Sequence, residues 1–413
     1  MTVVHVYGAY IPSRTEGISA NVHGLCNALA RAGAHVRQDC VPTDLGRLNS
    51  HRTLAASAWR GARCARVAGE DLDTALVHHH VSLLSTALPA RLGGRLGGWG
   101  AGRSRNGRAP VLVHAWNAHY EPGTAAGLPA RDRFAHRVAN GPEATALALR
   151  GIDDLVVATA YQARQVEALG FAGRLHIVPN GVDLETCRPR RPEETEVARH
   201  AFGLDGDPVL LYYGHATPWK GLRTLMAALP QVLREHPRAQ VLLSLTGYGR
   251  DRAWVLEEVR RQGLEGRVQC IGPSDLARLH AAADVAVLPA PAGVGTACYP
   301  NVLLECLAGG LPLVATRVGC VPEVVADGRT GLLAAPGEAG SLAQRIGELA
   351  GDPVLRRRLA SQARRSMESG FGWDAVAQRM LAVYRSIGIQ VPPAIRPPRP
   401  APAHGVPLLE GAA

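Results

Sequence analysis

Lys220 and Glu305 are the two residues of this sequence whose type and position most clearly suit chemistry. The chain has 45 basic lysine and arginine side chains, and Lys220 is the one lysine among them. Arginine does not replace lysine where a compact point charge is needed, so a single remaining lysine favours a role in phosphate binding. The alternative is that Lys220 was retained by chance. Glu305 lies one turn inside a predicted helix, where its carboxylate can accept hydrogen bonds from vicinal sugar hydroxyls.

The elements that position Glu305 form a predicted β-α-β unit. An apolar run over 284–289 predicts a buried strand, and a glycine-containing loop follows at 293–296. Pro300 and Asn301 open the helix, two glycines at 309–310 end it, and a second strand follows. The N-terminus of such a helix offers free N–H groups and a positive dipole end, which suit an anionic or hydroxyl-rich ligand.

The composition is that of a globular protein with room for two domains. The chain has 413 residues, of which 46% are hydrophobic and 19% charged, and it contains no apolar run long enough for a transmembrane helix. Its start lacks the pattern of a secretory signal. The net charge is +10, but the arginines are spread along the chain and aromatic residues make up only 5%, which disfavours nucleic-acid binding.

The cysteines and adjacent histidines give no sign of a metal site in the sequence. None of the eight cysteines forms a CxxC pair, so we expect them to be reduced. His78, His79 and His80 are adjacent and cannot all face one ion, and we interpret them as a strand end at a cleft.

The stretch around Glu305 resembles the nucleotide-sugar site of the retaining GT-B-fold glycosyltransferases of family 4 (glycosyl transferases group 1). The matching segments are 300–305 (PNVLLE), 310–316 (GLPLVAT) and 319–323 (GCVPE). The family's first glutamate, eight residues before the second, is Ala297 here. The resemblance implies that Glu305 holds the ribose of the nucleotide and leaves recognition of the donor sugar open.

This resemblance implies an α/β architecture of two Rossmann-like doubly wound parallel-sheet domains facing a cleft. The expected parts are an acceptor-binding domain at 1–186 with a flexible Gly/Arg loop at 88–109, a linker at 187–204, and a nucleotide-sugar-binding domain at 205–370. A terminal helix at 371–389 is expected to return to the first domain, and a disordered tail is expected at 390–413.

The resemblance also assigns donor-binding residues. The loop 214–221 resembles the family's diphosphate clamp, with Lys220 at the lysine position and His215 at the position of the usual arginine. Gly17 resembles the glycine under the diphosphate, and Gly247 belongs to a turn like the family's Gly-x-Gly. The expected donor-binding set is Gly17, Gly214, His215, Lys220, Gly247, Pro300, Asn301, Val302 and Glu305.

The first domain departs more from the family. Where the family has Thr-x-His at a strand end, this chain has His114 and Trp116, and His119 follows. Either histidine could replace the usual one near the reacting carbon, or both could be polar groups of a strand end. Trp116 could stack on a sugar ring. We expect Lys220, Glu305 and His114 as catalytic residues, and Glu16, Trp116 and His119 at the acceptor, with Glu121 and Asp132 as further carboxylates for a cationic acceptor.

The implied reaction moves a sugar from a nucleoside diphosphate sugar, UDP-GlcNAc or UDP-glucose being favoured, to a hydroxyl of a small acceptor in the cytoplasm. Cationic side chains are expected in place of a metal ion, with no other cofactor. The arginine-rich composition suits an actinobacterium, where an aminocyclitol of antibiotic biosynthesis is one candidate acceptor and a cell-envelope or thiol precursor another.

Two other functions stay open at this stage. A donor-binding pseudo-enzyme is favoured by the departures at Ala297, His215 and Trp116. A nucleotide-sugar epimerase of the same fold would need histidine–carboxylate pairs beside the sugar, and the sequence offers no clear pair. The oligomeric state and any contact with a membrane surface are not indicated.

Overall fold

A computed structural model of the chain describes residues 2–10, 17–42, 63, 67, 73–81, 109–116, 141–216, 220–246, 249–292 and 299–391. The chain divides into two compact units. Unit 1 contains residues 1–181, 297–299 and 373–399, and unit 2 contains residues 182–296, 300–372 and 400–413. Within the described ranges, no helix has both the length and the apolar character needed to cross a membrane.

Unit 1 is built on a six-stranded parallel sheet in the order β2-β1-β3-β4-β5-β6. Its strands are β1 (Thr2–Tyr10), β2 (Val36–Pro42), β3 (Thr74–Val81), β4 (Val111–Ala115), β5 (Asp154–Val157) and β6 (Arg174–Ile177). The inner strands β3, β4 and β5 are almost completely buried, as expected for the centre of a sheet covered on both faces, whereas the edge strand β6 is partly exposed.

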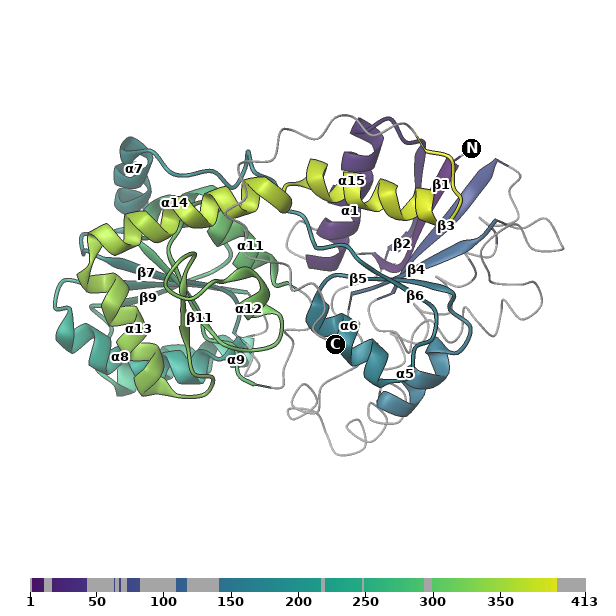
Figure 1. Cartoon of the computed structure of the whole chain (residues 1–413). Coiled ribbons are helices and arrows are strands. Elements are labelled where there is room, and N and C mark those ends of the chain that lie inside the picture. Colours follow the sequence, from purple (N-terminus) through teal and green to yellow (C-terminus); the bar gives the residue numbers. More distant parts are fainter. Residues whose placement is uncertain are drawn as a thin grey trace. The chain divides into compact units, whose positions relative to one another are not determined.

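Helices cover both faces of this sheet (Figure 1). On one face α1 (Gly17–Arg31) lies beside α15 (Trp373–Ser386), and their apolar side chains pack on Leu76 and Leu112 of the strands. A side chain at Gly24 would meet the ring of Trp373 at 2.4 Å, so this glycine allows the two helices to approach closely. On the other face lie α5 (Pro142–Leu149) and α6 (Ala160–Ala168).

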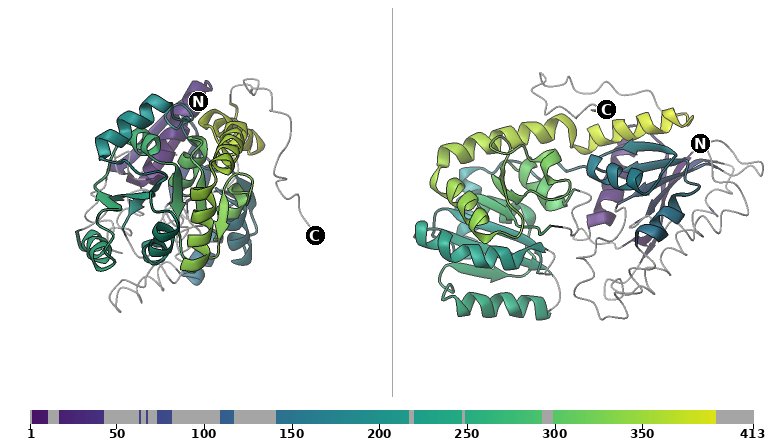
Figure 2. Two further views of the ribbon diagram at one scale, coloured as in Figure 1. Left: turned by 90° about the vertical axis from the view of Figure 1, so that its left-hand side faces the viewer. Right: turned by 60° about the horizontal axis from the view of Figure 1, so that its bottom comes forward.

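Unit 2 contains a second six-stranded parallel sheet, in the order β12-β11-β10-β7-β8-β9, with helices on both faces (Figure 2). Its strands are β7 (Val209–His215), β8 (Gln240–Thr246), β9 (Val268–Ile271), β10 (Val285–Leu288), β11 (Leu313–Thr316) and β12 (Leu332–Ala334). Its helices are α7 (Pro192–Phe202), α8 (Leu222–Glu235), α9 (Gly249–Arg261), α10 (Leu276–Ala282), α11 (Asn301–Ala308), α12 (Val321–Val324), α13 (Ala339–Gly351) and α14 (Pro353–Gly370).

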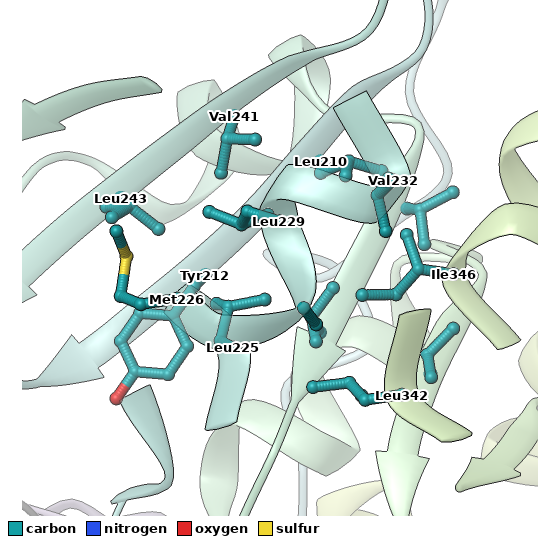
Figure 3. Close-up of a cluster of buried hydrophobic side chains, with 14 of the residues drawn as sticks. Leu210, Tyr212, Leu225, Met226, Leu229, Val232, Val241, Leu243, Leu342 and Ile346 are labelled. Carbon is teal, nitrogen blue, oxygen red and sulfur yellow. The ribbon is translucent and has the colours of Figure 1, made fainter. Parts of the chain in front are cut away.

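A large hydrophobic core of unit 2 lies between its sheet and the pair α8 and α13 (Figure 3). Apolar residues recur along α8 at the helical period, so Leu225, Leu229 and Val232 all face the strands. Ile346 of α13 packs on the same cluster. Burying several leucine and valine side chains, each worth about 1.5–3 kcal/mol, fixes α8 against the sheet. The first turn of α8 is thereby held at a fixed position beside the end of β7.

The stretch 187–204, expected as a linker, contains the helix α7 and lies within unit 2. Pro192 starts this helix at a position where its missing N–H costs nothing, and Gly203 ends it in the left-handed conformation. Arg199 of α7 and Arg190 before it both donate to the buried carboxylate of Asp284, which also accepts from the backbone N–H of Val209. These contacts attach α7 to the first strand of the sheet.

The predicted fold class of two doubly wound parallel-sheet domains is confirmed. The adjacent histidines lie at the end of a strand, as predicted, since β3 ends one residue later at Val81; the strand is buried throughout. The Gly/Arg loop falls outside the described residues except for Ala109, and most of the predicted tail, from residue 392, also lies outside them.

Asp284→Ala is expected to lower the free energy of unfolding of unit 2 by about 2–3 kcal/mol, because it leaves two part-buried guanidinium groups without their counter-charge. Hydrogen exchange of β7 and α10 peptides in increasing urea measures the loss. The matched control is Arg261→Ala, which breaks an exposed ion pair with Glu258 and should leave the free energy of unfolding nearly unchanged. An equal, small effect of both variants would contradict the structural role of Asp284.

Candidate functional site

The site is organised by the point in the second sheet where the strand order reverses. β7 is the first strand of unit 2, with β8 on one side and β10 on the other. The connections that follow β7 and β10 therefore leave toward opposite faces of the sheet, because crossovers between parallel strands are right-handed. In doubly wound sheets this arrangement opens a crevice at the carboxyl ends of the two strands, which is where such folds bind ligands.

The segment after β7 brings Lys220 to this edge. β7 ends at His215, and Lys220 directly precedes α8. Gly221 is the N-cap of α8, with φ of 76° and no side-chain cap. A Cβ at Gly221 would lie 1.6 Å from the carbonyl oxygen of Pro289, just after β10, so only glycine allows this close approach. The start of α8 thus offers backbone N–H groups and a cationic side chain at one place.

The segment after β10 leads to α11, which carries Glu305. Pro300 is the N-cap of α11 and provides no side-chain hydrogen bond to the first turn. Leu303, Leu304 and Leu307 are buried, so the helix packs on the sheet with its polar residues to one side. α11 ends at Ala308, whose carbonyl accepts from Arg364 of α14. Glu305 is therefore held about one turn behind the helix start.

Glu305 is the end of a hydrogen-bonded chain of three side chains. The hydroxyl of Tyr213, on β7, donates to Oε2 of Glu305 at 2.9 Å. Nε2 of His280, on α10, lies 3.0 Å from the same hydroxyl. Because the phenol has one proton and gives it to the carboxylate, Nε2–H of His280 must be the donor in the second bond. This hydrogen-bonded chain holds the Glu305 carboxylate in place through its Oε2.

Burial shifts the pKa of each of these three side chains in the direction that favours its neutral form. It raises the pKa of Glu305, which the hydrogen bond from Tyr213 partly opposes. It lowers the pKa of His280 to about 4, with a smaller contribution from the charge of Arg190, so His280 is neutral at pH 7. It raises the pKa of Tyr213 well above its ordinary value. The carboxylate is consequently poorly solvated. Hydrogen bonds donated by the hydroxyl groups of a ligand would stabilise it.

Chemically, this edge of the sheet suits a ligand with an anionic end and a vicinal diol. Two helix starts without side-chain caps and the ammonium group of Lys220 favour phosphate oxygens. The buried carboxylate of Glu305 favours paired hydroxyl donors. A nucleoside diphosphate carries both groups, in its diphosphate and its ribose.

Most donor-site residues predicted in unit 2 lie at this edge. Hydrogen bonding joins β7 to α11 through Tyr213 and Glu305, and backbone packing joins the start of α8 to the end of β10. The predicted residues placed here are Gly214, His215, Lys220, Pro300, Asn301, Val302 and Glu305. Gly247 falls outside the described residues, as do Glu16, His119, Glu121 and Asp132. Gly17 is the first residue of α1 in unit 1.

The predicted roles of His114 and Trp116 receive no support, because both are buried in unit 1. Trp116 packs on Val22 and Cys26, and the ring of His114 stacks on its indole at a centroid distance of 4.4 Å. Covered in this way, the indole ring offers no face to an acceptor sugar. Burial lowers the pKa of His114 to about 3, which makes it a neutral group of the interior.

One set of described residues has the geometry to hold a metal ion. Ring nitrogens of His5, His78 and His80, all buried in unit 1, lie within 4.8 Å of one another. The three adjacent histidines do not all belong to this set. His78 and His80, which point to the same face of β3, form it together with His5 of the neighbouring strand β1. This set is separate from the donor edge of unit 2.

Sequence reasoning missed Tyr213 and His280. Both lie within segments that the pattern explains as a buried strand and an ordinary helix, 67 positions apart in the sequence. The available signal was a polar-tipped aromatic residue at the end of an otherwise apolar strand, because a buried tyrosine hydroxyl needs a partner. Nothing local to His280 indicates that it turns toward β7.

Comparison with known families and proteins supports this description. Residues 207–352 match the family described as glycosyl transferases group 1. The chain is 30% identical over 283 residues to a glycogen synthase of Mycobacterium tuberculosis, a match that covers 66% of this chain and 61% of the relative. It is 31% identical over 243 residues to a D-inositol 3-phosphate glycosyltransferase of Nocardia farcinica, covering 56% and 52%. The chain thus spans roughly half to three fifths of the length of these relatives.

Solved structures match along most of the chain. A sucrose-phosphate synthase from Thermosynechococcus elongatus superposes with a TM-score of 0.73 at 21% identity, covering 94% of this chain and 98% of that one. HepE of Anabaena, in complex with UDP-glucose, gives a TM-score of 0.67 at 19% identity, covering 94% and 100%. These likenesses show the fold, and they agree with the GT-B architecture predicted from the sequence.

Glu305→Gln is expected to raise the free energy of unfolding at neutral pH by about 1 kcal/mol, because it removes a poorly solvated carboxylate. The pKa of Glu305 is raised by folding, so the charged form destabilises the folded chain above that pKa. The gain should disappear as the pH falls below the ordinary pKa of glutamate, where both states are protonated. Urea titrations of wild type and variant at both pH values measure it.

The control for this experiment is Glu257→Gln, on the exposed side of α9, which should change stability at neither pH. A Glu305→Gln variant that is less stable than wild type at neutral pH would show that the carboxylate is well compensated, contrary to the burial argument.

Proposed function

We propose that this chain transfers a sugar from a nucleoside diphosphate sugar to a hydroxyl of a small acceptor, since residues 207–352 match the family described as glycosyl transferases group 1. The observation that supports this most strongly is the arrangement at the carboxyl ends of β7 and β10. A buried carboxylate, an uncapped helix start and the one lysine of the chain flank the same edge. This set matches the ribose and the diphosphate of the donor.

The proposed transfer proceeds with retention of configuration. The bond between the anomeric carbon and the diphosphate oxygen breaks, and a bond to the acceptor oxygen forms on the same face. The acceptor proton passes to the leaving diphosphate, so no nucleophile of the protein is required. Lys220, with His215 as second cation, stabilises the charge that grows on the diphosphate, and we propose that these groups act in place of a metal ion.

For the donor we favour UDP-GlcNAc or UDP-glucose. For the acceptor we favour a small polyhydroxylated ring such as an aminocyclitol of antibiotic biosynthesis, since one relative is named a D-inositol 3-phosphate glycosyltransferase and also acts on a cyclitol. A cell-envelope or thiol-precursor acceptor is the second candidate. We place the reaction in the cytoplasm, where nucleotide sugars are made.

The test of this proposal is incubation of the purified protein with UDP-GlcNAc, UDP-glucose and GDP-mannose in turn. Each reaction contains a panel of acceptors that includes 2-deoxystreptamine and inositol 3-phosphate, and is scored for nucleoside diphosphate release and product mass. Product with one donor supports the proposal. Tight donor binding with no release or product for any pair would instead favour a donor-binding pseudo-enzyme.

Lys220→Ala is expected to lower turnover by about 100-fold or more, the effect of removing one electrostatic donor from a leaving group. The matched control is Arg223→Ala, which removes a cation from the first turn of the same helix. The guanidinium of Arg223 lies over the ring of Trp254, 4.5 Å from its centroid, so its loss should change turnover by about threefold or less. Turnover of Lys220→Ala within about tenfold of wild type would refute the role.

Glu305→Ala is expected to weaken donor binding by about tenfold or more, because the ribose loses hydrogen bonds to a charged group. Tyr213→Phe should weaken it by about threefold, since Tyr213 acts by holding Glu305 in place. Calorimetric titration with UDP measures both. In the Glu305→Ala background the Tyr213→Phe change should have no further effect, and additive losses would show that Tyr213 acts independently of Glu305.

A further inference from the structure

Four histidine rings lie in one buried layer of unit 1, on the sheet face that α1 and α15 cover. In the parallel register His5 of β1 is opposite His78 of β3, and His80 of β3 is opposite His114 of β4. Since side chains alternate along a strand, His78 and His80 point to the same face and His79 points to the other. All four rings are at most 2% exposed.

The rings contact one another and Tyr384 of α15. The Nδ1 atom of His5 lies 2.9 Å from Nε2 of His80. The Tyr384 hydroxyl lies 2.8 Å from Nδ1 of His78 and 3.3 Å from Nε2 of His5. Ring centroids of His5 and His78 are 4.7 Å apart, and those of His78 and His80 are 4.3 Å apart. Three strands and one helix thus direct polar groups into one small volume.

Half of the ring nitrogens in this layer have no hydrogen-bond partner. They are Nε2 of His78, Nδ1 of His80, and both nitrogens of His114. Each buried polar atom left unpaired costs about 1–3 kcal/mol, so a layer needed only for packing would be more stable with apolar side chains. A neutral imidazole ring keeps one lone pair, which can bind a metal ion.

We propose that His5, His78 and His80 bind a transition-metal ion of the zinc type, with the hydroxyl oxygen of Tyr384 beside them as a fourth donor. Nitrogen atoms of the three rings already lie within 4.8 Å of one another. Tetrahedral zinc, with zinc–nitrogen distances of about 2.0–2.1 Å, needs its ligand atoms about 3.3 Å apart. Binding would therefore bring the nitrogen atoms closer together than they are in this structure.

The donor set selects the class of ion. Neutral imidazole is a ligand for zinc, copper, nickel and iron, whereas magnesium and calcium need several oxygen ligands. Among the described residues, the polar partners of the three rings are one another's nitrogen atoms and the phenolic oxygen of Tyr384. A magnesium or calcium ion would find too few oxygens here, so the site suits an ion of the zinc type.

Such an ion would have a structural role. Its ligands come from β1 and β3 at the centre of the sheet and from α15, which packs on α1 at a distance of several hundred residues along the chain. Cross-linking of these three elements through one ion would hold α15 on unit 1. The site contains none of the residues proposed to bind the donor, so its occupancy can be tested without reference to sugar transfer.

The test uses the full chain, purified without a polyhistidine tag. Elemental analysis should give about one zinc per chain, and chelator treatment should lower the unfolding temperature by a few degrees. Adding cobalt(II) to the metal-free protein should produce the visible absorption bands of tetrahedral cobalt, saturating at about one equivalent. Magnesium should restore neither the bands nor the unfolding temperature.

Variants locate the ion. His78→Gln and His80→Gln should each abolish the cobalt bands, whereas His79→Gln, a change of the neighbouring ring on the opposite face of β3, should leave them intact. Metal-free wild-type protein that is folded, judged by circular dichroism, and shows neither bands nor a metal-dependent unfolding temperature would overturn the proposal even if the variants fail to fold. Bands that survive in both His78→Gln and His80→Gln would overturn it as well.

Discussion

The adjacency of β7 and β10 in the second sheet is the constraint on which the proposed donor site depends. Because the connections after these strands leave toward opposite faces, the start of α8 and the start of α11 both lie at one edge of the sheet. The close approach of Gly221 to Pro289 fixes the first segment, and the hydrogen bond from Tyr213 to Glu305 fixes the second. The fold thereby positions Lys220, the two helix starts and the Glu305 carboxylate in the absence of a ligand.

Burial of polar groups has different consequences in the two units. In unit 2 the carboxylate of Glu305 is poorly solvated, yet it has a specific partner in Tyr213, which in turn is bonded to His280. This arrangement lowers the free energy of unfolding, and it provides a carboxylate that can bind hydroxyl groups. In unit 1 the histidine layer has similar burial but leaves several nitrogen atoms without partners. The missing partners there suggest an ion, whereas the complete chain in unit 2 suggests a substrate.

The sequence predicts those features that local signals encode. The apolar strands and amphipathic helices of unit 2 follow from periodicity, and α11 follows from Pro300 and the glycines that end it. The helix α7 was missed because its charged residues and prolines resemble a linker. Its acidic partner, Asp284, lies far along the chain and gives no local signal. Tyr213, His280 and the histidine layer also depend on contacts between distant strands. Strand register determines these contacts, and it cannot be predicted from any single segment of the sequence.

The most direct test of the account is a crystal structure of the protein with UDP. We predict that the ribose hydroxyls lie within hydrogen-bonding distance of the Glu305 carboxylate, while the diphosphate meets the start of α8 and the ammonium group of Lys220. The Tyr213 hydroxyl should keep its bond to Glu305 in the complex. A nucleotide bound elsewhere, or bound at this edge with its ribose away from Glu305, would contradict the central claim that the ends of β7 and β10 form the donor site.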